Sequence, residues 1–182
     1  MRDMSGEAGE QPVDAIDLTI QQWRRQRPDL DLSAMDMFAR LGRLARLLEP
    51  TVEQVFARHG LRKGEFDVLA ALRTAAHPHT LIPSELSATL MMSRAGMTNR
   101  LDRLEAAGLV ARTLDPADRR SFRIALTDQG ERVIDATVTD HAANLTRLAA
   151  TLGPEDAASL DRIVRTMLAK LDQPTEAAEA EA

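Results

Sequence analysis

The sequence predicts a mainly α-helical protein that carries one small β-hairpin. Aromatic residues make up only 3% of the 182 residues, so the core must consist of Leu, Val, Ile, Met and Ala, a composition that favours helices. Apolar residues recur at helical spacing over most of the chain, whereas two short extended runs, 109–114 and 121–126, flank a polar turn. With 44% apolar and 28% charged residues, the chain has the composition of one globular domain.

The segment 84–127 reads as helix, turn, helix, strand, turn, strand. A short helix over 84–89 is followed by a turn, and Ser93 can cap the next helix with its hydroxyl. This second helix runs from Arg94 to about Ala107 and ends at Gly108, because glycine readily adopts the left-handed conformation that stops a helix. The order of elements is that of a helix-turn-helix followed by a β-wing.

The helix that begins at Arg94 has an apolar and a polar face. Met97, Leu101 and Leu104 recur at steps of four and three, which gives one apolar stripe. Arg, Asn and Thr on the other side are the side chains that contact phosphates and base edges in a major groove. The residues predicted to contact DNA from this helix and its cap are Ser93, Arg94, Thr98, Asn99 and Arg103.

The turn of the hairpin adds two arginines, Arg119 and Arg120, which we expect to contact the DNA backbone or the adjacent minor groove. The segment from Arg94 to Arg123 holds seven arginines and four acidic residues, a net charge of +3 in a chain with a total of −5. A local positive field in an acidic chain predicts a confined nucleic-acid contact and excludes indiscriminate coating of nucleic acid.

These motifs together resemble the MarR family of winged helix-turn-helix regulators. The resemblance covers roughly residues 33–171 and implies a homodimeric, DNA-binding regulator rather than an enzyme. It implies a repressor that binds a pseudo-palindromic operator and is released by a small anionic or aromatic metabolite. The motifs that carry the resemblance are Ser84-Glu85-Leu86, the run from Thr98 to Val110, the wing from Asp115 to Ser121, and Leu126-Thr127.

A closer resemblance is to the urate-responsive branch of this family, the HucR and PecS type. In that branch a tryptophan on an extra N-terminal helix, an aspartate and a recognition-helix arginine line a ligand pocket, and Trp23, Asp67 and Arg100 match these positions. The branch has a further arginine where this chain has Thr74, with Arg73 one place earlier. The resemblance implies a small-molecule effector, urate-like or a carboxylate, and no cofactor.

The remaining helices are expected to build a dimerisation lobe from residues 13–61 and 128–172, around a winged helix-turn-helix lobe of residues 62–127. Ser33 with Asp36 resembles a capping box, and Pro50 should kink the helix that follows. A last helix opened by Pro154 has an apolar stripe that we expect to face a second copy. The ends, 1–12 and 173–182, have the composition of disordered segments.

Several classes of function are excluded or disfavoured by the composition. The chain has no cysteine, which excludes thiol-based sensing, and no apolar run near the roughly 20 residues of a membrane span, so we expect a cytoplasmic protein. Two alternatives stay open: a constitutive architectural DNA-binding protein, in which Trp23 only packs and Asp67 only caps its helix, or a metal-responsive regulator using His77 and His79.

Overall fold

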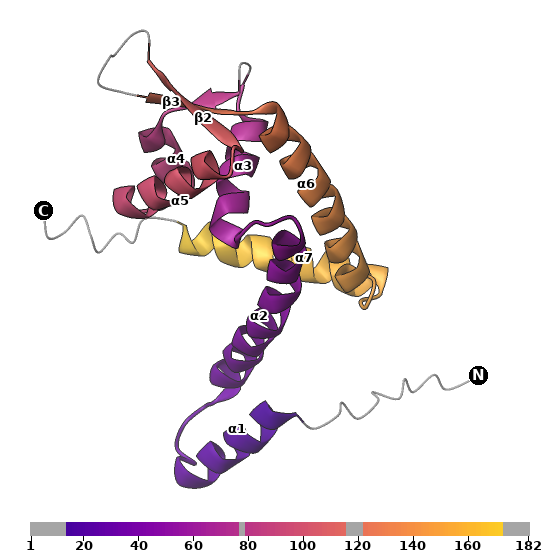
Figure 1. Ribbon diagram of the computed structural model, residues 1–182. Helices are drawn as coiled ribbons and strands as arrows, with labels where there is room; N and C mark the ends of the chain where they lie inside the picture. Colours follow the sequence, from indigo (N-terminus) through magenta and orange to yellow (C-terminus); the bar gives the residue numbers. More distant parts are fainter. Residues whose placement is uncertain (1–13, 77–78, 116–121, 173–182) are drawn as a thin grey trace, which may run out of the picture. The chain divides into compact units, whose positions relative to one another are not determined.

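The computed structural model describes residues 14–76, 79–115 and 122–172 (Figure 1). The predicted fold class is confirmed, since helices predominate and one small antiparallel sheet is present. The chain divides into two compact units, Met1–Val52 and Glu53–Ala182, and each is described by itself. The segments predicted to be disordered, 1–12 and 173–182, lie outside the described residues.

The first unit contains helix α1, Ala15–Gln26, and the first part of helix α2, Ser33–Arg58. The predicted extra N-terminal helix is confirmed, and it starts at Ala15 because Asp14 occupies the cap. The Asp14 carboxylate accepts from the backbone N–H of Ile16 (2.6 Å) and of Asp17 (3.0 Å), and Asp17 accepts in return from the Asp14 N–H (2.7 Å). This reciprocal capping fixes where α1 begins.

The predicted capping box at Ser33 and Asp36 was wrong. At the start of α2 the acceptor is Asp31. Its carboxylate accepts hydrogen bonds from the Ser33 backbone N–H (2.9 Å) and from the Ser33 hydroxyl (2.6 Å). Asp36 instead forms an ion pair with Arg40 one turn further along α2 (2.6 Å). An aspartate two residues upstream competes well with a serine hydroxyl because a carboxylate is the stronger acceptor.

The second unit has its core between helices α3, Lys63–Thr74, α4, Pro83–Thr89, and α5, Arg94–Ala106. Helix α2 runs through Pro50 into this unit and ends before Gly60, whose φ of 72° is in the left-handed region that favours glycine. The largest side chains that are fully buried among the described residues are Phe56, Val68, Leu69, Leu72, Leu86, Met97, Leu101, Leu104, Ile124, Ile134 and Thr137. The predicted apolar stripe of α5 is therefore the face that packs inward.

The predicted hairpin is confirmed as strands β2, Val110–Leu114, and β3, Phe122–Leu126, paired antiparallel with Val110 opposite Leu126. A third strand, β1, Thr80–Leu81, pairs with the other edge of β3, so the order is β1-β3-β2. The sequence analysis missed β1 because a two-residue strand carries no periodicity. This strand ties the α3–α4 connection to the base of the wing.

Two further helices complete the described part of the second unit: α6, Asp128–Ala149, and α7, Pro154–Leu171. Thr127 caps α6, because its hydroxyl accepts from the Gly130 N–H (3.0 Å). Its hydroxyl also donates to the Gly108 carbonyl (2.7 Å), which links the end of α5 to the start of α6. No described helix combines the length and the apolar character needed to cross a membrane.

Helix α7 buries none of its side chains in the single chain. Five of its large apolar side chains are between 40% and 75% exposed, namely Leu160, Ile163, Val164, Leu168 and Leu171. Val138 and Leu145 of α6, which the periodicity predicts to face inward, are each 44% exposed. A single chain therefore leaves apolar faces of α6 and α7 exposed to solvent, which is typical of an interaction surface.

Candidate nucleic-acid interface and ligand site

Helix α5 presents its polar face outward because its apolar face is locked into the core. Ser93 caps the helix as predicted, with its hydroxyl accepting from the Gly96 N–H (3.2 Å). Arg94, Thr98 and Asn99 are all exposed, and the Thr98 hydroxyl donates to the Arg94 carbonyl (3.0 Å). Three of the predicted contact residues therefore lie together on one accessible face, with a hydrogen-bonding inventory suited to base edges and phosphates.

Arg103 differs from the other predicted contact residues because it already has a protein partner. Its Nε lies 2.8 Å from Oε1 of Glu65, a nearly buried carboxylate in the first turn of α3. The Arg103 side chain is still 40% exposed, so it contacts Glu65 of α3 and remains partly accessible to solvent. Sequence reasoning missed Glu65, because a glutamate in the first turn of a helix is ordinarily assigned to capping.

Asp67 and Arg100 lie in the same part of the second unit, on α3 and α5. The structure shows no ion pair between them at 4.0 Å or less, although Arg100 is close enough to attract the carboxylate. Burial raises the pKa of Asp67 above its usual value, and the charges of Lys63 and Arg100 oppose that shift only in part. Asp67 is thus a half-buried carboxyl that lacks a full cationic partner.

Arg100 is half-buried and lies against the backbone of Gly64 at the start of α3. A Cβ atom at Gly64 would come within 2.6 Å of Nη2 and 2.7 Å of Cζ of the Arg100 guanidinium. A side chain at position 64 would therefore displace the Arg100 guanidinium from its present place. The close approach places a cationic side chain of α5 over the amino-terminal turn of α3.

Trp23 belongs to the first unit, where it lies on α1 with 47% of its surface exposed. Arg73, the neighbour of Thr74, is engaged elsewhere: its guanidinium pairs with Asp135 of α6, with Nε 2.9 Å from Oδ1. The Thr74 hydroxyl donates to the Ala70 carbonyl of its own helix (2.9 Å). Neither residue supplies a free cation at the position where the urate-responsive branch has an arginine.

Three ion pairs involve the arginines of the two wing strands within the described residues. Arg112 of β2 contacts two carboxylates of α5, with Nη2 2.5 Å from Asp102 and Nε 3.3 Å from Glu105. Arg123 of β3 lies 3.0 Å from Asp115, whose side chain is only 8% exposed. The predicted wing-tip contacts, Arg119 and Arg120, lie outside the described residues.

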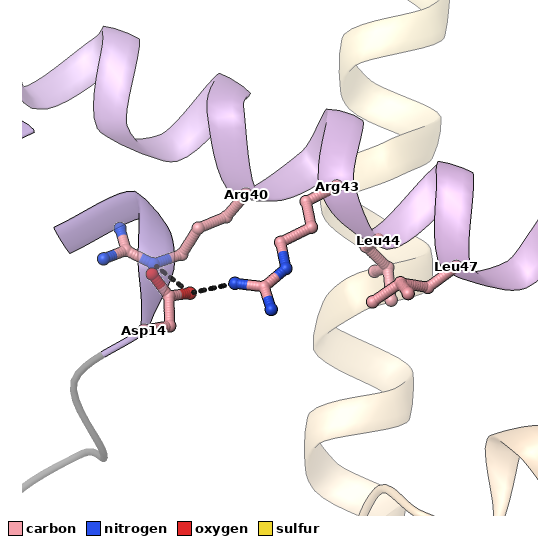
Figure 2. A pocket seen from close by; sticks show the side chains of 5 residues that line it. All are labelled: Asp14, Arg40, Arg43, Leu44 and Leu47. Atoms are coloured by element: carbon pink, nitrogen blue, oxygen red, sulfur yellow. Dashed lines mark ion pairs between the residues drawn. The ribbon is translucent and has the colours of Figure 1, made fainter. Parts of the chain in front are cut away.

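The first unit holds a cavity of about 290 Å³ lined by Asp14, Arg40, Arg43, Leu44 and Leu47 (Figure 2). Asp14 lies between the two arginines, 3.5 Å from Arg40 and 3.7 Å from Arg43. Arg40 also pairs with Asp17 and Asp36. Hydrogen bonds from the backbone of Asp17 and Ile16 and the two arginine charges together lower the pKa of Asp14, against the opposing effect of burial. The arginines are therefore neutralised by acidic neighbours.

The histidines do not assemble a metal site in the part of the chain that the structure describes. His59 contacts Asp140 of α6 (2.9 Å), and Nδ1 of His79 contacts the Ala75 carbonyl (2.8 Å). Among the described residues, no group of three or more His, Asp or Glu side chains is placed so that it could hold a metal ion. His77, the other candidate ligand, lies outside them.

The arrangement of α4, α5 and the β2–β3 hairpin defines a winged helix-turn-helix transcriptional regulator. Residues 59–121 match the family model described as "MarR family". The chain is 41% identical over 125 residues to the HTH-type transcriptional regulator PecS from Dickeya dadantii (strain 3937), covering 69% of this chain and 75% of PecS. It is 27% identical over 128 residues to the HTH-type transcriptional repressor YetL of Bacillus subtilis (strain 168), covering 70% and 76% of the two chains.

Among solved structures, Sco3205, a MarR family transcriptional regulator from Streptomyces coelicolor crystallised in complex with DNA, matches with a TM-score of 0.67 and 27% identity. The match covers 81% of this chain and 93% of Sco3205. This chain belongs to the MarR family of DNA-binding transcriptional regulators. The resemblance found in the sequence and the expectation that the chain is not an enzyme are thereby confirmed.

Proposed function

We propose that this chain is a homodimeric transcriptional repressor that binds a pseudo-palindromic operator and is released by a small anionic or aromatic metabolite. The observation that carries the DNA-binding part is the outward face of α5, on which Arg94, Thr98 and Asn99 are exposed while the opposite stripe is buried. Sco3205, a relative of the same fold, was crystallised with DNA, and YetL is described as a repressor. A repressor of this kind acts in the cytoplasm.

The homodimer is supported by the apolar side chains that the single chain leaves exposed on α7. A helix with this much exposed apolar surface gains about 25 cal/mol for each Å² that a partner covers. Two-fold symmetry also doubles the contacts of a helix-turn-helix protein and sets the spacing of its half-sites. We assign dimerisation to residues 13–61 and 128–172, and DNA recognition to residues 62–127.

The residues proposed to contact the effector are the three that the family resemblance implies: Trp23 on α1, and Asp67 and Arg100 in the second unit. Asp67 supports it, since a half-buried carboxyl with a raised pKa and an incomplete cationic partner is typical of a functional position. Arg100 belongs to the helix that carries the DNA-reading face, so an anion that attracts Arg100 would act directly on that helix. A coupling of roughly 1–3 kcal/mol between the two sites would suffice for release from DNA.

Selection of bound duplexes from a random DNA library, followed by fluorescence polarisation, tests the DNA-binding part. We expect an inverted repeat with half-site centres about one helical turn apart, bound by two chains in analytical ultracentrifugation. Enrichment of asymmetric or unrelated sequences would contradict the proposal. The constitutive architectural alternative predicts weak sequence preference and no effector.

A thermal-shift screen of purines, phenolic acids and citrate-like acids tests the effector part. A genuine effector should stabilise the free protein, by about 2.7 kcal/mol at a concentration of 100 times its Kd, and should weaken operator binding. Trp23→Phe and Asp67→Asn should shift the effector midpoint severalfold. Identical release curves for both variants and the wild type would place the effector elsewhere.

A further inference from the structure

Glu65 has two different partners, one for each oxygen of its carboxylate. Oε2 accepts the backbone N–H of Arg62 (2.8 Å), which caps the amino-terminal end of α3. Oε1 lies 2.8 Å from Nε of Arg103, which belongs to α5. The Glu65 side chain is only 9% exposed. A carboxylate this deeply buried needs a cation, and within the described residues Arg103 is the cation that pairs with it.

Arg103 uses only the inner edge of its guanidinium in this contact. Nε is buried and contacts Glu65 as an ion pair without the geometry of a hydrogen bond, and no hydrogen bond or ion pair of the two Nη groups with another described residue is found. Because 40% of the side chain is exposed on the helix that reads DNA, the Nη groups are left for an external acceptor. An arginine paired with a buried carboxylate on the neighbouring helix has fewer accessible rotamers than a free arginine, so its outer edge is restricted in position.

A second contact joins the same two helices. Arg100, one turn before Arg103 on α5, lies against Gly64, the residue before Glu65. The amino-terminal turn of α3 therefore receives two arginines of α5, one on a glycine backbone and one on a buried carboxylate.

We propose that Glu65 is a positioning residue for DNA recognition: it holds Arg103 by Nε so that the Nη groups are presented to a phosphate or base edge of the operator. The inference rests on the proposed function, since it needs α5 to be the DNA-reading helix. Removing an acidic residue near a DNA-binding face ordinarily strengthens binding, whereas loss of Glu65 should weaken operator binding.

The test variant is Glu65→Gln, because glutamine can still accept the Arg62 N–H and preserve the cap of α3 while losing the charge that holds Arg103. A matched control exists on the neighbouring helix. Glu85 accepts the Ile82 N–H (2.9 Å) at the start of α4, but it is exposed and has no ion pair among the described residues. Glu85→Gln thus removes the same charge and keeps the same kind of cap without affecting an arginine.

Operator affinity and its salt dependence should be measured for wild type, Glu65→Gln, Glu85→Gln, Arg103→Gln and the Glu65→Gln/Arg103→Gln double variant. We expect Glu65→Gln to lose roughly fivefold or more in operator affinity, with Glu85→Gln equal to wild type or slightly tighter. The double variant should match Arg103→Gln alone, and both Glu65→Gln and Arg103→Gln should lower the salt slope by about one.

Three results would overturn the inference: operator binding of Glu65→Gln at or above wild-type strength, an unchanged salt slope, or additive losses in the double variant. If Glu65→Gln fails to fold, the operator affinity of Arg103→Lys tests the inference instead. The single ammonium of lysine cannot contact both Glu65 and DNA, so Arg103→Lys should bind the operator as weakly as Arg103→Gln does. Wild-type affinity for Arg103→Lys would then refute the role. Failure of the wild type itself to select an operator would instead refute the proposed function.

Discussion

Arg112 and Asp102 form an ion pair between the wing strand β2 and helix α5, with Nη2 2.5 Å from Oδ1. Nε of the same guanidinium lies 3.3 Å from Glu105, one turn further along α5. A single arginine thus spans two carboxylates on one helix and fixes the wing strand relative to the DNA-reading helix. The helix and the wing, the two elements proposed to contact DNA, are thus linked by this bridge.

Asp102→Asn should weaken operator binding about threefold, even though it removes a negative charge close to DNA. The reason is that the wing strand loses its best contact with α5. Stability should fall by less than about 1 kcal/mol, since the Asp102 side chain is 56% exposed. The measurement is fluorescence polarisation with a urea melt of the same sample. Asp128→Asn, an exposed acid on α6, serves as control, and tighter binding by Asp102→Asn would contradict the bridge.

Asn99→Ala should change base preference as well as affinity. An exposed asparagine on the reading face can bond an adenine in a bidentate manner, so its loss should cost about 1–3 kcal/mol at one position of the operator. Binding to a series of operators with single substitutions reports this cost. A uniform loss over all operators would make Asn99 a backbone contact.

Replacing Arg119 and Arg120 together by Ala should weaken binding to operator and unrelated DNA alike. These contacts are predicted from the sequence to be mainly electrostatic, so the slope of log K against log salt should fall by about two. Titrations at four or more salt concentrations give the slope. An unchanged slope would show that the wing tip does not touch DNA.

Ile163→Glu should convert the dimer to a monomer. Ile163 is 49% exposed on α7 in the single chain, and a buried charge without a partner at an interface costs several kcal/mol. Sedimentation equilibrium measures the change, and operator affinity should fall with it. Thr166→Glu places the same side chain at a polar exposed position of α7 and should remain dimeric. A dimeric Ile163→Glu protein would place the interface elsewhere.

Asp67→Asn should be at least as stable as the wild type at pH 7. Burial raises the pKa of Asp67, so the folded state favours the protonated carboxyl and resists its ionisation. The stability that Asp67 contributes is therefore complete below its unfolded pKa of about 3.9 and is lost as the pH rises through the raised folded value. Urea unfolding of both proteins between about pH 4 and pH 7 gives the difference. If the free energy of unfolding of the wild type instead increased relative to that of Asp67→Asn as the pH rises, the prediction would be wrong.

The sequence by itself determined the winged helix-turn-helix and the exposed face of its reading helix. Those features follow from local rules, since the spacing of Met97, Leu101 and Leu104 decides which side of α5 is buried. Ser93, Gly108 and Thr127 likewise fixed helix boundaries through their own backbone chemistry. A family resemblance added the residues expected around an effector.

Only the tertiary structure decided which charged side chains are paired. Glu65 and Arg103 are 38 positions apart along the chain, and Arg73 of α3 pairs with Asp135 of α6. No local sequence pattern therefore distinguishes these paired charges from solvated ones. The same holds for Gly64, whose missing side chain matters only because Arg100 lies on it. Periodicity reports which face of a helix is buried, whereas the partner of a buried charge depends on how the helices pack against each other.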